Sequence, residues 1–387
     1  MPARSGDDGE PAAATLTWEQ VLAWRMRRQH LDRRAPRGEM LAVAGDICGL
    51  HAQLMSSAEL ALWARVADLE GGAMQRALWQ DRALVKAWAM RGTLHLLPSA
   101  EYPTWQAALS TYRHPERGYW QRYFGVTPEQ LERLLEVIPL ALDGPPLTRE
   151  ELADAVASLT GSPELGSRLR GGWGSLLKPA SYLGYLCFAD SVGNNVRFTR
   201  PDRWLPAWHP QDPAGALGAV FRRYLGAKGP ATEADLVRWW TGISTARARH
   251  LLKGLGEQVV PVSIEGTSAW ALVENLPDLL AAGPTGAVRL VPAFDQYVIG
   301  AAPDAPELLL PPAMRARVYR PQAWISPVLL ADGRMEATWR HERKRSQVSV
   351  TIEPFRPLPP WVRQGAEREA ESLAHFLGGR LELTWAS

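Results

Sequence analysis

A histidine and a glutamine stand two positions apart in a short connection between predicted helices, as His51-Ala52-Gln53. In an extended segment, residues i and i+2 point to the same side, so the imidazole and the carboxamide could converge on one water molecule. A neutral imidazole can accept a proton near pH 7, and an amide can orient water by hydrogen bonding. Such a pair in a loop is also common as ordinary hydrogen-bonded structure. Water activation is therefore one of two interpretations of His51 and Gln53.

Two clusters of positive charge are candidates for contact with a polyanion. The first contains these arginines, interrupted by Asp32: Arg25, Arg27, Arg28, Arg33, Arg34 and Arg37. The second includes one acidic residue, Glu342, among these side chains: Arg340, His341, Arg343, Lys344 and Arg345. Each cluster is either a solvated face or a set of phosphate contacts. The net charge of +2 does not by itself indicate a nucleic-acid-binding protein, but two clusters beside turn signals favour DNA as the partner.

The composition restricts the class of protein. With 46% hydrophobic and 22% charged residues, the chain is typical of a folded globular protein. No apolar run reaches the ~18 residues of a membrane span, and residues 1–15 lack the features of a secretory signal and predict a disordered tail. Cys48 and Cys187 are too few for a disulfide framework, and no CxxC or HExxH motif occurs. We therefore expect a cytoplasmic protein without metal or cofactor.

The elements that must position His51 and Gln53 are predicted from helix caps and apolar periodicity. Thr17 is expected to cap the first helix, and Ser56 with Ser57 the third. Helices are predicted over 18–28, 37–48, 56–68 and 72–80. Residues 83–90 and 93–97 predict a β-hairpin that turns at Arg91-Gly92. Helices followed by such a hairpin are typical of a winged helix, in which one helix reads a groove of DNA.

The same order of helices and hairpin occurs twice more. Thr148 is expected to cap the second round. Its helices and strands are predicted over 148–159, 173–183, 185–190 and 196–199. Those of the third round are predicted over 215–225, 232–240, 244–255, 258–264 and 268–273. The pattern predicts three winged-helix units, at residues 16–112, 113–210 and 211–283.

After Pro284 the predicted elements are mostly strands. Asp332-Gly333 is a strong hairpin turn. Strands are predicted over 288–291, 297–299, 323–330, 334–340, 347–352 and 380–385, with one helix over 360–377. Residues 284–387 therefore predict a small β-barrel-like domain. The expected fold class is mainly α with β, namely tandem winged-helix units followed by that domain.

Several ordered motifs carry a resemblance to a known family. They are Gly49-Leu50-His51-Ala52-Gln53, the run from Ser57 to Arg65, Arg91-Gly92-Thr93-Leu94-His95-Leu96-Leu97, the segment 290–297, and Asp332-Gly333-Arg334 leading to Trp339. Together they resemble the winged-helix DNA-binding family that contains the AlkZ and AlkX (YcaQ) DNA glycosylases, over about residues 16 to 385. The resemblance implies three tandem winged helices plus a β-barrel in a C-shaped clamp. It also implies hydrolysis of the glycosidic bond of N7-alkylated purines.

The resemblance further implies which residues act. AlkZ-type members carry a Gln–apolar–Gln motif and act on bulky natural-product adducts and crosslinks, often as self-resistance. AlkX-type members carry Gln–apolar–Asp and act on simpler crosslinks. The matching positions here are His51, Ala52 and Gln53, so the glutamine at the second polar position is kept and a histidine replaces the first. By this resemblance Gln53 orients a water molecule and His51 holds it or accepts its proton.

The remaining assignments concern the partner, which we expect to be double-stranded DNA with an alkylated purine, bound by a monomer. The predicted DNA contacts are Arg37, Arg91, His95, Arg340, Arg343, Lys344 and Arg345. Asp295 is expected to be a structural cap or brace, and Trp339 a core residue. A DNA-binding regulator without activity is the main alternative, since winged helices are more often regulators than enzymes. A protein that sequesters the natural product is a third, which no residue favours.

Overall fold

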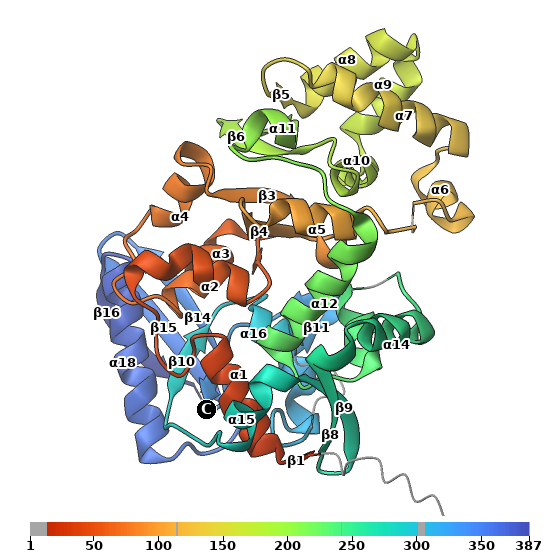
Figure 1. Cartoon of the computed structure of the whole chain (residues 1–387). Coiled ribbons are helices and arrows are strands. Elements are labelled where there is room, and N and C mark those ends of the chain that lie inside the picture. The colour runs from red at the N-terminus through yellow and green to blue at the C-terminus, as the bar shows by residue number, and fades with distance from the viewer. Residues whose placement is uncertain (1–13, 114, 241, 301–305, 387) are drawn as a thin grey trace, which may run out of the picture.

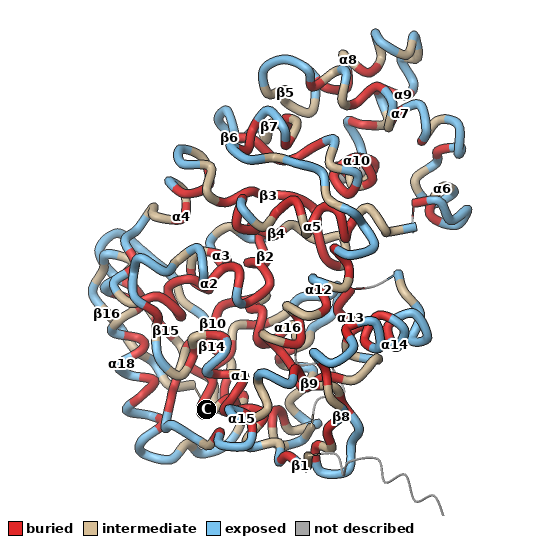
Figure 2. The backbone as a smooth tube through the Cα atoms, viewed as in Figure 1, coloured by how far each residue is buried: buried red, intermediate tan, exposed pale blue. Residues whose placement is uncertain are grey.

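The computed structural model describes residues 14–113, 115–240, 242–300 and 306–386. Its helices and strands form four groups along the chain, each with its own sheet (Figure 1). Two large hydrophobic cores and a small third one hold these groups together, and the buried stretches run through the centre of each group (Figure 2). No helix among the described residues is both long and apolar enough to cross a bilayer.

The first group contains the His51 segment. Its sheet has the order β2-β4-β3, with β2 Leu50–His51, β3 Leu84–Trp88 and β4 Leu94–Pro98. Its helices are α1 Trp18–Arg28, α2 Met40–Asp46, α3 Met55–Trp63, α4 Ala73–Gln75 and α5 Tyr102–Leu109. Thr17 caps α1 as predicted, by a capping box with Gln20. The third helix differs from its prediction, because α3 begins at Met55 without a side-chain cap and ends at Trp63.

The second group forms a lobe of its own in Figure 1. Its sheet has the order β5-β7-β6, with β5 Leu147–Thr148, β6 Cys187–Val192 and β7 Asn195–Thr199. The helices are α6 Gly118–Phe124, α7 Pro128–Ala141, α8 Arg149–Thr160, α9 Pro163–Arg170, α10 Lys178–Tyr182 and α11 Pro201–Trp204. Thr148 caps α8 through a capping box with Glu151, as its position in the sequence predicts.

The third group takes one strand from the beginning of the chain. Its helices are α12 Pro213–Lys228, α13 Glu233–Trp240, α14 Thr245–Gly254 and α15 Leu276–Leu280, and its hairpin is β8 Val259–Ile264 with β9 Thr267–Leu272. The third strand is β1 Ala14–Leu16, which pairs in parallel with β8 at Leu16 and Ile264. Of the predicted tail 1–15, residues 1–13 lie outside the described residues, and Ala14 and Thr15 belong to this sheet.

The fourth group is an open five-stranded sheet instead of the predicted barrel. Its order is β10-β13-β14-β15-β16, so β10 and β16 are its edges within the described residues. These strands are β10 Val288–Val291, β13 Val328–Ala331, β14 Arg334–Lys344, β15 Gln347–Pro354 and β16 Arg380–Trp385. Helix α18 Pro360–Phe376 packs against β10 and β16. Because a helix covers this sheet, its apolar face is buried without closure of the strands into a barrel.

One predicted strand of this group was wrong, and another is interrupted. Residues 297–299 belong to a helix, α16 Gln296–Gly300, because Asp295 accepts a hydrogen bond from the Tyr297 amide at 2.8 Å and so caps the turn. The predicted strand 323–330 is split into β12 Trp324–Ile325 and β13. The first of these pairs with β11 Tyr319–Arg320 in a separate hairpin that follows α17 Arg315–Val318.

Candidate active site

The His51 segment is the short edge strand of the first sheet. Leu50 pairs with Leu96 and His51 with His95, and the Ala52 amide donates to the Leu94 carbonyl at 2.7 Å. Extended pairing therefore reaches Ala52, and the chain bends at Gln53 before α3 begins at Met55. This arrangement fixes the backbone of residues 50–52 on β4 and leaves Gln53 at the junction of strand and helix.

The His51 ring is enclosed by two other rings. It stacks on Phe294 with centroids 4.9 Å apart and meets the edge of His95 at 5.4 Å. Only 6% of the residue is exposed. Its Nδ1 is fully buried without a hydrogen-bond partner, which leaves Nε2 as the ring nitrogen at the surface. Burial, and to a lesser extent the nearby Arg91 cation, lower the pKa of His51 to about 3. The ring is therefore a neutral imidazole at physiological pH.

Gln53 has a contrasting environment. Its residue is exposed, and within the described part of the chain its carboxamide makes no hydrogen bond. Both its oxygen and its nitrogen are thus available to an incoming molecule. The site combines one enclosed, preoriented ring with one free amide, two residues apart.

His95 lies behind His51 and has no exposed surface. Its Nδ1 is 3.1 Å from the Thr93 carbonyl, and burial holds its pKa well below the usual range. The predicted direct contact of His95 with DNA therefore needs correction, because no surface of this residue is accessible to a phosphate. Its position is that of a ring that supports His51 from within the sheet.

A buried ion pair lies next to Phe294, the residue whose ring stacks on His51. Arg65 donates two hydrogen bonds to Asp295, at 2.7 and 2.8 Å, and neither side chain is exposed. Asp295 follows Phe294, whose backbone adopts the left-handed region with φ 57°. The bidentate pair anchors the turn that carries the Phe294 ring. Asp295 is thus both the brace and the helix cap that the sequence predicts.

Arg91 occupies the turn between β3 and β4. Its φ of 58° is uncommon for a residue with a side chain. The guanidinium is half-buried and donates to the Trp239 carbonyl at 3.4 Å. Burial lowers the pKa of Arg91, and its charge acts on both His51 and His95. The predicted contact residue is therefore close to the candidate site and directed inward from the hairpin turn.

The second basic cluster lies at the far end of β14 and in the turn to β15. Arg340 pairs with Glu353, and Lys344 with Glu342 at 2.9 Å. Arg343 and Arg345 are exposed and form no ion pair within the described residues. These two arginines are the members of the cluster whose charges are free to meet a phosphate.

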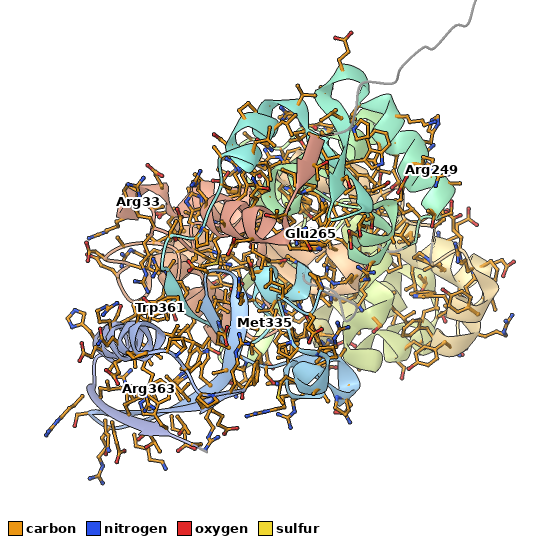
Figure 3. All side chains as sticks on the ribbon, turned by 90° about the horizontal axis from the view of Figure 1, so that it is seen from below. Arg33, Arg249, Glu265, Met335, Trp361 and Arg363 are labelled. Carbon is orange, nitrogen blue, oxygen red and sulfur yellow. The ribbon has the colours of Figure 1, made fainter. Side chains whose placement is uncertain are left out.

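The first basic cluster is largely structural. Arg25 and Arg28 each donate at 2.9 Å to a backbone carbonyl in or just after the last turn of α12, where cations are favoured by the helix dipole. Arg34 pairs with a glutamate of α18 at 2.9 Å, and Arg37, a predicted DNA contact, pairs with Glu70 at 2.7 Å. Figure 3 shows Arg33, Arg249 and Arg363 on separate parts of the surface. Local partners therefore occupy most of this cluster.

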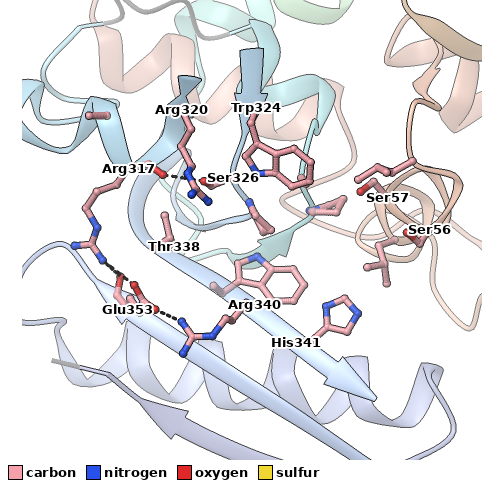
Figure 4. A pocket seen from close by; sticks show the side chains of 17 residues that line it. Ser56, Ser57, Arg317, Arg320, Trp324, Ser326, Thr338, Arg340, His341 and Glu353 are labelled. Atoms are coloured by element: carbon pink, nitrogen blue, oxygen red, sulfur yellow. Dashed lines mark hydrogen bonds and ion pairs between the residues drawn. The ribbon is translucent and has the colours of Figure 1, made fainter. Parts of the chain in front are cut away.

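A cavity of about 630 Å³ adjoins the His51 segment (Figure 4). One wall is the start of α3, with Leu54, Ser56 and Ser57, directly after Gln53. The other wall comes from the C-terminal part of the chain and includes Trp324 and Arg320. The cavity therefore begins one residue after Gln53 in the chain, at Leu54.

Sequence reasoning did not assign Phe294 and Trp324, which form an aromatic row with His51. Phe294 lies 4.9 Å from His51 and 5.0 Å from Trp324, measured between ring centroids. The signal for Phe294 was its place beside Asp295 in a recognised motif, whereas nothing near Trp324 in the sequence distinguishes it from other tryptophans. The row links the candidate site to the cavity.

Comparison with known proteins agrees with this arrangement. A family model described as DNA glycosylase AlkZ-like matches residues 44–376. An interstrand DNA cross-link repair glycosylase of Streptomyces sahachiroi is 37% identical over 368 residues, which are 94% of this chain and 97% of that protein. The solved structure of the S. sahachiroi DNA glycosylase AlkZ superposes with a TM-score of 0.88 at 35% identity, and covers 96% of this chain and 100% of that one.

The fold and the comparisons define a DNA glycosylase, an enzyme that hydrolyses N-glycosyl bonds in DNA. The chain belongs to the AlkZ-like DNA glycosylase family. Its mixed α and β architecture is that of the S. sahachiroi enzyme.

Proposed function

We propose that this enzyme removes N7-alkylated purines, including bulky adducts and interstrand crosslinks, from double-stranded DNA. The observation that carries the proposal is the neutral His51 ring with its Nε2 at the surface, two residues from the exposed carboxamide of Gln53. The S. sahachiroi relative is described as a cross-link repair enzyme, which supports the wider substrate range.

Alkylation at N7 makes the purine cationic and therefore a good leaving group. In the proposed reaction the bond between C1′ and N9 breaks, and its electron pair neutralises the purine. A water molecule then forms a bond to the electron-poor C1′. Gln53 orients this water through its amide, and His51 accepts a hydrogen bond from it at Nε2. Positioning of this kind accelerates the reaction without a covalent intermediate.

The low pKa of His51 fits a limited role in proton transfer. Burial lowers this pKa to about 3, so the ring is a weak base. Water that has added to a sugar cation is itself strongly acidic, so a weak base suffices to take its proton on the way to solvent. His51 therefore acts in this proposal mainly by holding the water in place.

DNA binding is proposed to involve several parts of the chain. Three winged-helix units, at 16–112, 113–210 and 211–283, and the β-rich part at 284–387 act as one monomeric clamp. In support, the first two units each contain helices and a three-stranded sheet, and the third contains helices and a hairpin whose sheet is completed by β1. Arg343 and Arg345, with Arg340 and Lys344 beside them, contact phosphates. An open clamp accommodates bulky adducts that a closed base pocket would exclude.

The test is an abasic-site assay on duplex DNA that contains one N7-methylguanine, with alkali to convert abasic sites into strand breaks. We expect Gln53→Ala to lower the single-turnover rate by about 10²-fold, since removal of one positioning group commonly costs that much. His51→Ala should cause a similar loss. His51→Gln, which restores a neutral polar group, should retain a rate within about tenfold of the original.

The matched control is Gln364→Ala, at an exposed position on α18 that lines neither cavity, which should leave the rate unchanged. Full activity of Gln53→Ala would contradict the assignment of this residue. Tight binding to undamaged DNA without any abasic product would instead support a regulator.

A further inference from the structure

A second cavity, of about 560 Å³, lies where the first three groups of elements meet. Its lining comes from the β3–β4 turn with Arg91 and Gly92, from α6, and from α10 with Lys178. We call it the junction chamber. Its volume is within the ~300–1,000 Å³ typical of small-ligand pockets.

Two cations in the junction chamber have no acidic partner among the residues that the structure describes. Arg91 and Lys178 are both half-buried and line the cavity, and neither forms an ion pair within the described part of the chain. No acidic residue occurs among the described residues that line it. Unpaired cations in such a setting cost free energy that an anionic ligand would recover. The lining of the chamber therefore favours the binding of a negatively charged ligand.

The remaining walls of the junction chamber are aromatic. Trp120 and Phe124 lie 4.5 Å apart between ring centroids, and Phe124 and Tyr123 lie 4.9 Å apart. Tyr123 is 82% exposed, a large exposed fraction for an aromatic side chain. Tyr182 also lines the chamber, and a side-chain carbon on Gly92 would come within 3.1 Å of its hydroxyl. The chamber therefore presents flat apolar surfaces beside its two cations.

We propose that the junction chamber binds one unstacked nucleotide of the DNA, with its base against Tyr123 and its phosphate against Lys178 and Arg91. A nucleotide combines the anion and the flat ring that this lining requires, and base stacking on aromatic side chains does not depend on sequence. The position of Arg91 favours a nucleotide over a free aromatic compound, because Arg91 lies in the turn that leads into β4, and β4 carries His95 opposite His51. A phosphate held by Arg91 would therefore lie beside the sheet that carries the candidate active site. The inference rests on the proposed function only in taking DNA as the ligand.

The test uses a duplex with a single bulged 2-aminopurine, whose fluorescence falls when the base stacks, and the same duplex fully paired. The full-length enzyme should bind the bulged duplex at least fivefold more tightly and quench its emission. Tyr123→Ala should remove most of the quenching, and Lys178→Gln should reduce the preference for the bulge about fivefold. Tyr185→Ala and Lys253→Gln change exposed residues outside the lining and should leave both signals intact.

Equal affinity for bulged and paired duplexes, or quenching that survives Tyr123→Ala, would overturn the inference. So would a loss of anthraquinone-2-sulfonate binding in the two variants without any change in DNA binding, which would indicate a site for free aromatic anions.

The abasic-site assay distinguishes failure of the junction chamber assignment from failure of the proposed glycosylase function. Bulge preference without abasic product would contradict the glycosylase substrate and leave the junction chamber assignment standing. Abasic product without bulge preference would contradict the junction chamber assignment and leave the glycosylase substrate standing.

Discussion

At the residue scale, the enclosure of His51 determines its protonation across the usual assay range. Burial and the Arg91 charge place its pKa at about 3, below the ordinary value of 6.5. The same enclosure affects stability, because a histidine with a depressed pKa takes up its proton more readily in the unfolded chain. Its contribution to the free energy of unfolding is therefore lost as the pH falls from about 6.5 towards 3.

We expect the single-turnover rate on N7-methylguanine DNA to stay flat between pH 8 and pH 5. His51 remains neutral throughout this range because its pKa is about 3. The measurement is the rate of abasic-site formation at each pH, corrected for spontaneous depurination in the absence of enzyme. A fall in rate with a midpoint near pH 6.5 would show that His51 titrates as an exposed histidine.

The sequence indicated which residues of the site to examine, but it did not predict their environments. His51 and Gln53 stand together in a motif, and this adjacency is visible in the sequence alone. Their different exposure is not, because the ring that covers His51 is Phe294, which folds back from the C-terminal part of the chain. For the same reason His95 was predicted to contact DNA although it is fully buried.

At the scale of elements, the Arg65–Asp295 pair joins the end of α3 to the start of α16. We expect Asp295→Asn to lower the free energy of unfolding by about 3–5 kcal/mol, since it leaves the Arg65 charge buried and unpaired. Urea denaturation measures this loss. Arg133→Ala, which breaks an exposed pair with Glu136 on α7, is the control, and should cost at most about 0.5 kcal/mol. A loss below about 1 kcal/mol in Asp295→Asn would mean that the pair does not hold these elements together.

The sequence predicted those helix starts that depend on hydrogen bonds between residues close together in the chain. Thr17 and Thr148 mark the starts of α1 and α8 because each side chain satisfies backbone amides of its own helix. The prediction of a strand over 297–299 was wrong, because three residues are too few to distinguish a strand from a helix. The residue that caps the helix, Asp295, is held in place by Arg65, which is distant in the sequence. The open C-terminal sheet could not be distinguished from a barrel, because closure depends on whether the two edge strands meet.

At the scale of the whole molecule, few positively charged side chains are available to bind DNA phosphates, and they lie in a restricted part of the surface. Net charge is +2, and most of the first basic cluster is engaged by partners within the protein. Long-range attraction to DNA should therefore depend on a few exposed residues, among them Arg343 and Arg345.

We expect the double variant Arg343→Ala with Arg345→Ala to reduce the salt dependence of DNA binding. Each phosphate contact contributes about 0.9 to the slope of log K against log salt concentration, so the slope should become less steep by about 1.8. Fluorescence anisotropy of an undamaged duplex at several salt concentrations measures it. Arg133→Ala should leave the slope unaltered, and an unchanged slope in the double variant would exclude these residues from the interface.

The pairing of β1 with β8 has a consequence for how the protein can be divided. Because the third sheet is completed by residues 14–16, a fragment that begins at residue 211 lacks one of its own strands, and one that stops before residue 259 leaves the first strand without its neighbour. During synthesis on the ribosome this sheet must wait until most of the chain has emerged. Biochemists who wish to study separate pieces would do better with a circularly permuted chain, in which residues 14–28 follow residue 283, than with simple truncations.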